Sequence, residues 1–325
     1  MRTVAALLVS LLLLAGCSSS DEPRWVDADV SFAADGLTIY GTYRYREGAA
    51  PGPAALLISE SGATDRNGDN AVAGPVGNMR QLAELLSDRG VASLRYDKVG
   101  TGKTGLGPFA QRPTEVVSAV YTAGAAAALR HLADQAGTDK ARVSVYALGE
   151  GSIHAMSLAT ASDAPKVHAL GLFQPLPGRY LDIITNRVRA NAGPEALSTW
   201  LAAVEQVRTI GTVPPNLPEG LGALLNQGNV RAVIEADKID PVALAARLPA
   251  DMPVLVTCSD ADAQASCDAV RPLVDALEHT APTLVELKGV NHVLRDDASD
   301  NVANYASQDP LSPQVTQALD RFVAK

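Results

Sequence analysis

The sequence predicts an α/β fold in which a mostly parallel central sheet is flanked by helices and carries an inserted helical cap. Two β-rich segments come first, at 27–33 and 37–46. Apolar runs of strand length then alternate with helical segments, which is typical of a parallel sheet covered on both faces. This alternation stops at 175–248, where helical segments separated by Gly and Pro show no strand signal. The predicted domains are therefore a core, 27–174 and 249–325, and a cap, 175–248.

Strand length and turn residues place the elements before the cap. Strands are expected at 54–59, 91–96, 142–147 and 167–173, each an apolar run of suitable length. Helices are expected at 78–89, 115–136 and 151–161. The first is amphipathic and ends at Gly90, while the second lies between Pro113 and Gly137, which are start and stop signals.

Helices dominate the cap, and the alternation resumes after it. Cap helices are expected at 179–190, 195–209 and 220–236. They are followed by a strand at 252–258, a helix at 266–279, a strand at 283–287 and a closing helix at 312–323. The return to strand and helix indicates that both parts of the core share one sheet.

The composition of the chain argues against a nucleic-acid-binding protein. The chain has 325 residues, 47% of them hydrophobic, and a formal net charge of −9. Such a chain can bury a large core. No run of Lys and Arg is present, and binding of nucleic acid depends on such clusters. A nucleic-acid partner is therefore not expected.

The N-terminal segment predicts export. Arg2 precedes an apolar run at 4–15 that is too short to span a bilayer. The run ends in Leu-Ala-Gly-Cys17, which resembles the bacterial lipobox. The resemblance implies a signal peptide at 1–16, a lipidated Cys17, a tether at 17–26 and an extracytoplasmic protein that two or more acyl chains anchor to the cell membrane. The alternative is an ordinary secretory signal with an incidental cysteine.

Cys258 and Cys267 are the two other cysteines. An exported protein can form disulfides, and a bridge across so short a loop would stabilise the fold by about 2–3 kcal/mol. Two free thiols are the alternative. No histidine or second cysteine pair lies nearby in the sequence, so no metal site is predicted.

Four segments resemble, in chain order, motifs of the α/β-hydrolase superfamily, in particular its serine aminopeptidase-like and esterase-like members. The first is Ile-Ser-Glu-Ser-Gly-Ala-Thr-Asp-Arg-Asn-Gly at 58–68. In that fold this loop supplies one N–H group of the oxyanion hole, which the resemblance assigns to Glu60 or Ser61. Glu60 stands where the family has glycine. Its carboxylate would oppose an oxyanion if it pointed inward; the alternative is a side chain in solvent.

The second segment, Arg-Tyr-Asp-Lys-Val-Gly-Thr-Gly-Lys-Thr at 95–104, resembles the turn after the family's fourth strand. Its Gly-Lys-Thr ending could be taken for a phosphate-binding loop. The first glycine of that motif would have to stand at Asp97, which excludes the match. We expect a tight turn that orders the edge of the site.

The third segment, Val-Tyr-Ala-Leu-Gly-Glu-Gly-Ser at 145–152, resembles the nucleophile elbow Gly-x-Ser-x-Gly. Small residues occupy the flanking positions, but Gly149 replaces the serine and Leu148 replaces the usual histidine. Glycine adopts the strained elbow conformation freely, so we expect the turn to persist. The N–H of Glu150 would still point into the oxyanion hole.

The fourth resemblance supplies the acid and the base. Asp262 follows a predicted strand and matches the family's acid, with Asp260 as the second choice. His292 ends the Gly-Val-Asn-His segment at 289–292 and matches the base. The order nucleophile, acid, base agrees with the fold. An ordinary loop histidine is the alternative reading of His292.

The missing hydroxyl leaves two hypotheses of function. Without a serine at 149, an acyl-enzyme cannot form at this position. One hypothesis is a pseudo-hydrolase that binds a small apolar or acyl-type ligand under the cap, on a floor made more apolar and roomier by Leu148 and Gly149. The other is an ester or amide hydrolase that uses Ser152 or Ser61 as a surrogate nucleophile, or a water activated by His292 or Glu60 in the vacated space. Neither hypothesis requires a cofactor.

Overall fold

The computed structural model describes residues 24–324 of the chain. The predicted signal peptide, the lipidated Cys17 and most of the predicted tether lie outside this range. Between residues 24 and 324, no helix combines the length and apolar character needed to cross a membrane.

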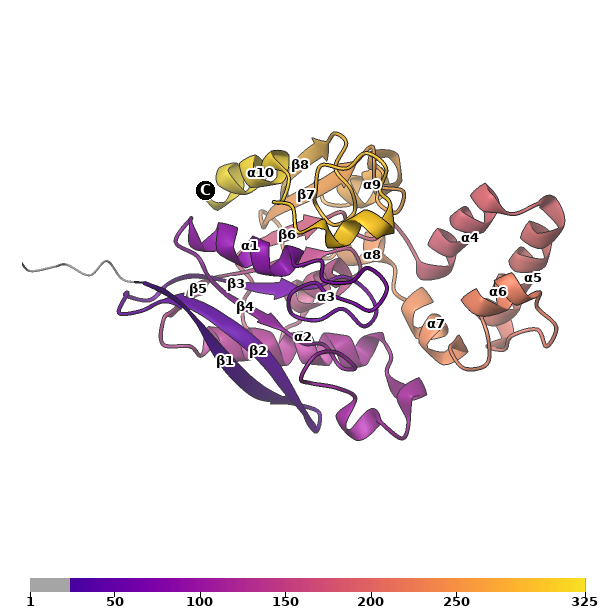
Figure 1. Cartoon of the computed structure of the whole chain (residues 1–325), viewed down its shortest axis with the longest axis horizontal. Coiled ribbons are helices and arrows are strands. Elements are labelled where there is room, and N and C mark those ends of the chain that lie inside the picture. The colour runs from indigo at the N-terminus through magenta and orange to yellow at the C-terminus, as the bar shows by residue number, and fades with distance from the viewer. Residues whose placement is uncertain (1–23, 325) are drawn as a thin grey trace, which may run out of the picture.

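One eight-stranded sheet forms the centre of the molecule, in the order β1-β2-β4-β3-β5-β6-β7-β8 (Figure 1). The strands are β1 Trp25–Ala34, β2 Leu37–Arg46, β3 Gly52–Ile58, β4 Ala92–Tyr96, β5 Thr138–Leu148, β6 Leu170–Phe173, β7 Pro253–Ser259 and β8 Ala281–Leu287. Strands β1 and β2 form an antiparallel hairpin at one edge, and β2 also pairs antiparallel with β4. All other pairs are parallel. The predicted sheet is confirmed, including its continuation in β7 and β8 after the cap.

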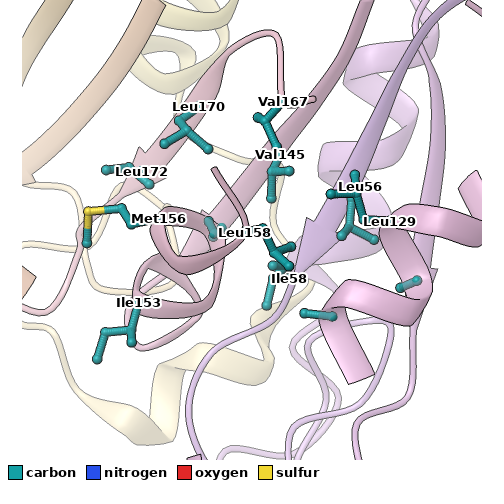
Figure 2. Packing of buried hydrophobic residues seen from close by; sticks show 14 of the residues in the cluster. Leu56, Ile58, Leu129, Val145, Ile153, Met156, Leu158, Val167, Leu170 and Leu172 are labelled. Carbon is teal, nitrogen blue, oxygen red and sulfur yellow. The ribbon is translucent and has the colours of Figure 1, made fainter. Parts of the chain in front are cut away.

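Helices cover both faces of the sheet, as expected for buried parallel strands. One face carries α2 Ser118–Ala133, α3 Gly151–Thr160 and α9 Cys267–Asp275, and the other carries α1 Asn78–Ser87 and α10 Pro313–Val323. The strand residues alternate between the two apolar clusters: Leu56 and Ile58 belong to the first, and Leu57 to the second. Figure 2 shows the first cluster, where Ile153 and Met156 lie near the strands.

The interval predicted as a cap contains helices alone. They are α4 Tyr180–Asn191, α5 Pro194–Ile210, α6 Glu219–Leu224, α7 Val230–Asp237 and α8 Pro241–Ala245. The first four share an apolar cluster of their own around the buried Trp200 and lie to one side of the sheet (Figure 1). In contrast, Leu244 and Ala245 of α8 pack into the core cluster. The independent hydrophobic unit of the cap is therefore α4 to α7.

Two predicted helices differ most from those observed. The helix predicted at 115–136 begins only at Ser118, because Val116 and Val117 are extended and a short 3-10 turn, Pro113–Glu115, precedes them. The helix predicted at 220–236 is split into α6 and α7. The side chains of Asn226 and Asn229 hydrogen-bond to the backbone between them, and this favours a turn.

The disulfide between Cys258 and Cys267 is present. It joins the end of β7 to the first residue of α9. The bridge therefore braces the loop that carries Asp262.

Candidate functional site

The candidate residues meet at one edge of the sheet. Glu60 follows β3, Lys98 follows β4, Gly149 follows β5, Asp262 follows β7 and His292 follows β8. All five strands are mutually parallel, so their carboxyl ends lie together. This edge is where open α/β sheets place their sites.

The turn at Gly149 has the geometry of a nucleophile elbow. Gly149 has a φ of 54° and lies between β5 and α3. Its N–H donates to the carbonyl of Phe173 at 3.0 Å. A side chain at Gly151 would come within 2.8 Å of the Ile58 carbonyl oxygen, which explains the small residue there. The elbow is thus intact although its hydroxyl is missing.

Asp262 and His292, which the resemblance implied as acid and base, lie in contact. His292 Nδ1 lies 2.7 Å from Asp262 Oδ2, and the two residues are only 2% and 1% exposed. The other oxygen of Asp262 accepts the backbone N–H groups of Gln264 and Ala265. The second choice, Asp260, instead binds the N–H of Gly289 at the surface.

The Glu60 side chain points inward and takes the place of the nucleophile. Its Oε2 lies 2.6 Å from His292 Nε2. Its Oε1 accepts the N–H of Ser61 at 2.6 Å and that of Glu150 at 3.5 Å. A Cβ atom built on Gly149 would lie 1.6 Å from Glu60 Oε2. The carboxylate therefore fills both the nucleophile position and the oxyanion hole.

This arrangement corrects three expectations. The pocket floor at Gly149 is not roomier and more apolar, since a carboxylate occupies the space. For the same reason the vacated position holds no room for an attacking water. The alternative in which Glu60 points to solvent is also wrong, because its side chain is only 19% exposed.

The two surrogate serines do not reach the base. Ser152 is fully buried and its hydroxyl donates to the Gly149 carbonyl at 2.6 Å. Ser61 is exposed, and its N–H binds the Glu60 carboxylate. Both ring nitrogens of His292 are taken by Asp262 and Glu60. Neither serine is therefore placed as a nucleophile in this structure.

Lys98 is a site residue that the sequence reasoning missed. Its ammonium donates to the backbone carbonyl of Glu60 and lies 5.5 Å from the ring centroid of Tyr121. Burial lowers the pKa of Lys98, while the carboxylates of Glu150 and Glu60 oppose this effect. In the sequence Lys98 stands within the turn motif at 95–104, and no spacing pattern marks it as a site residue.

The turn at 95–104 is held by Asp97. Its carboxylate accepts Arg66 Nη2 at 2.8 Å and the N–H of Lys103 at 2.8 Å. These bonds join the Glu60 loop to the end of β4. The segment acts as the ordered turn that we expected at the edge of the site.

The charges at the site reinforce one another. Burial alone would raise the pKa of Glu60, but the attraction of His292 and the hydrogen bonds from His292 and Ser61 lower it to about 2. Burial alone would lower the pKa of His292, but Glu60 and Asp262 raise it well above the ordinary value of 6.5. The raised pKa of His292 and the lowered pKa of Glu60 both favour an imidazolium–carboxylate pair between these two side chains.

A groove of about 340 Å³ opens beside this pair. Its lining includes Glu60, His292, Val76, Val293 and Tyr305. All of its lining residues come from the core, most of them from loops, and none from 175–248. Within residues 24–324, no group of three or more His, Cys, Asp or Glu side chains is placed to hold a metal ion.

The ring of His292 should carry two protons at pH 7, because two carboxylates stabilise the cation, and ¹⁵N NMR of the imidazole nitrogens measures this directly. His154 is the internal control: burial and the nearby Lys98 lower its pKa to about 3, so it should remain neutral. A midpoint for His292 at or below 6.5 would contradict the assignment.

The same pair makes stability depend on pH. The raised pKa of His292 contributes stability that is complete below about 6.5 and is lost as pH rises through the folded-state pKa. The lowered pKa of Glu60 contributes stability that is complete above about 4.5 and is lost as pH falls towards 2. Stability from this pair should therefore be greatest between these two limits.

Comparison with known proteins supports the fold. No family model matches the chain, and no curated protein matches it. Solved structures do match. An esterase from Pyrococcus furiosus is 14% identical, with a TM-score of 0.54 over 92% of this chain and 91% of that one. An α/β hydrolase from Penicillium is 16% identical, with a TM-score of 0.57 over 92% of this chain and 100% of that one.

A third match is Est1E from Butyrivibrio proteoclasticus, in a structure with ferulic acid bound. It is 16% identical, with a TM-score of 0.58 over 91% of this chain and 100% of that one. Together with the parallel sheet and the intact elbow, these likenesses define the class: the chain has the α/β-hydrolase fold. At this level of identity the likeness describes architecture.

Proposed function

We propose that this protein is a ligand-binding pseudo-hydrolase of the cell envelope, anchored through a lipidated Cys17. The observation that carries the proposal is the Glu60 carboxylate, which occupies the nucleophile position and is bonded to His292 and to both oxyanion-hole donors.

The three groups that a serine hydrolase needs for acyl transfer are missing or occupied at this site. Acyl transfer needs a nucleophile at the elbow, a neutral histidine to accept its proton and empty N–H groups to bind the oxyanion. Gly149 has no hydroxyl. The raised pKa of His292 keeps the base protonated at neutral pH, and Glu60 already occupies the N–H groups of Ser61 and Glu150.

Glu60 itself is a weak replacement for the serine. A carboxylate whose pKa is lowered to about 2 is a poor base and a poor nucleophile at neutral pH. Its Oε2 also lies within hydrogen-bond distance of His292 Nε2, at 2.6 Å, which lowers its reactivity further. The arrangement supports binding in preference to turnover.

The groove supports a small apolar or acyl-type ligand. Pockets for small ligands are mostly apolar with a few polar groups. The groove beside Glu60 combines Val76, Val293 and neighbouring alanines with the polar Glu60 and His292. We place the ligand in this groove, between the loop after β3 and the segment after β8, in place of the expected position under the cap.

The test is hydrolysis of p-nitrophenyl butyrate by the full chain in detergent. We expect turnover no faster than in buffer and no labelling by a fluorophosphonate probe, since no activated hydroxyl is present. The alternative function, an active hydrolase with another nucleophile or a water, requires turnover that His292→Ala abolishes. That result would overturn the proposal.

A further inference from the structure

The hydrogen bonds of the Glu60 carboxylate indicate the kind of chemical group that fits this site. Its carboxylate is held by three donors: the His292 imidazolium and the backbone N–H groups of Ser61 and Glu150. Charge-assisted hydrogen bonds of this kind are about twice as strong as neutral ones. The site is therefore a complete carboxylate receptor that the chain fills with its own side chain.

The groove extends from this receptor, and His292 is the one cationic side chain among the described residues that line it. Its volume of about 340 Å³ is within the usual range for small-ligand pockets. The described residues that line it include Ala63, Val72, Ala73, Val76, Val293 and Val302, and no Lys or Arg. The receptor end therefore offers the one cation for an anionic group among the described lining residues. The remainder of a ligand would contact mainly apolar side chains, together with the polar Thr64, Asn70, Asn78 and Gln264.

We propose that the site binds a monocarboxylate with an apolar tail, with its head group in the position of the Glu60 carboxylate and its tail in the groove. Glu60 is then an intramolecular competitor that keeps the receptor closed. This inference rests on the proposed function, since it requires a site that binds without turnover.

The structure allows Glu60 to leave the receptor by rotation of its side chain. Lys98 holds the backbone carbonyl of Glu60, so the main chain need not move. The groove borders the Glu60 side chain, and the next three residues, 61–63, are exposed. The displaced carboxylate would thus reach water at the mouth of the groove.

The covalent attachment of the Glu60 carboxylate to the chain sets how strongly it competes with a free ligand for the receptor. A group attached by a short flexible link acts at an effective concentration in the millimolar range or above. A free carboxylate must exceed this concentration to open the wild-type site. Removal of the Glu60 carboxylate should therefore expose a receptor of higher affinity.

The experiment is calorimetric titration of the full chain with hexanoate and with hexanamide, its neutral analogue, at pH 7. Glu60→Ala should bind hexanoate at least about tenfold more tightly than the wild type does, and more tightly than it binds hexanamide. Glu60→Gln is the matched control, because it fills the receptor with a neutral group of the same shape. Because the receptor prefers a carboxylate to an amide, its affinity for hexanoate should lie between those of the wild type and Glu60→Ala.

Two results would overturn the inference. One is equal binding of hexanoate and hexanamide by Glu60→Ala, and the other is hexanoate binding no tighter than in the wild type. Thermal unfolding establishes that each variant is folded, and Glu60→Gly replaces Glu60→Ala if the latter is not. In the wild type, high hexanoate concentrations should shift the NMR signals of the His292 ring, whereas hexanamide should not.

Ester turnover is measured on the same preparations. Hydrolysis by the wild type would refute the proposed function. A silent protein whose Glu60→Ala variant fails to bind hexanoate would refute only the identity of the ligand.

Discussion

Gly149→Ser alone should gain no esterase activity, whereas Glu60→Gly/Gly149→Ser should gain turnover that depends on His292. In the single variant the new Cβ meets Glu60 Oε2 at 1.6 Å and Cδ at 2.4 Å. Atoms cannot approach so closely, so the new side chain and the carboxylate compete for one position. While Glu60 keeps its three hydrogen bonds, the serine cannot take the elbow geometry. The φ of 54° at this position adds about 1–3 kcal/mol of strain for a non-glycine residue.

The double variant lacks the Glu60 carboxylate that prevents catalysis in Gly149→Ser. Without Glu60, the N–H groups of Ser61 and Glu150 are free to bind an oxyanion. His292 loses one of the two carboxylates that raise its pKa and becomes available as a base, still oriented by Asp262 at 2.7 Å. A complete triad accelerates acyl transfer greatly over the oxyanion hole alone. We expect a gain on the order of 10²–10⁴-fold over Gly149→Ser.

Kinetics with p-nitrophenyl butyrate measure this gain. The matched control is the double variant with His292→Ala added, which should return to the rate of the single variant. Equal activity in Gly149→Ser and in the double variant would show that Glu60 is no obstacle. A folded but silent double variant would show that the scaffold has lost more than its nucleophile.

His292→Ala should be the most destabilising single substitution at the site. It removes the cation between Glu60 and Asp262 and leaves the fully buried Asp262 and the 19% exposed Glu60 without a cationic partner. Removal of one member of a buried ion pair costs about 3–5 kcal/mol. Because Glu60 is partly exposed to solvent, we expect a loss near the lower limit, about 3 kcal/mol.

A double-mutant cycle separates this effect from simple loss of packing. Glu60→Ala added to His292→Ala should restore part of the stability, with a coupling of about 1–3 kcal/mol in urea unfolding. His154→Ala is the control, because His154 is buried and neutral, with a ring nitrogen 2.8 Å from Thr122. Its cost should be the same with or without Glu60. A loss below about 1 kcal/mol for His292→Ala, or no recovery, would contradict the ion-pair assignment.

The hydrogen bonds of Glu60 have two opposite effects, one on stability and one on catalysis. The bonds that Glu60 makes with His292 and with the oxyanion-hole donors stabilise the fold and at the same time close the reaction site. An active hydrolase keeps these groups unsatisfied until substrate arrives. In this chain they are satisfied within the molecule.

The order of elements could be predicted from the sequence because it depends on local periodicity. Apolar runs before and after the cap predicted the parallel strands, and the break at 175–248 predicted the inserted helices. The strand-end positions of Asp262 and His292 predicted their meeting, since parallel strands bring their carboxyl ends to one edge. Gly149 was recognised as the empty nucleophile position from the motif around it.

The direction of the Glu60 side chain was decided only by the tertiary structure. Two of its three partners lie 90 residues away, at Glu150, and 232 residues away, at His292, so no local pattern connects them. Nor does any pattern connect Lys98, which holds the Glu60 carbonyl from the end of another strand. Periodicity reports which face of one segment is buried, whereas a rotamer depends on the charges and donors that several segments bring together. The sequence by itself therefore determined that the hydroxyl is absent, and the tertiary structure decided that a carboxylate takes its place.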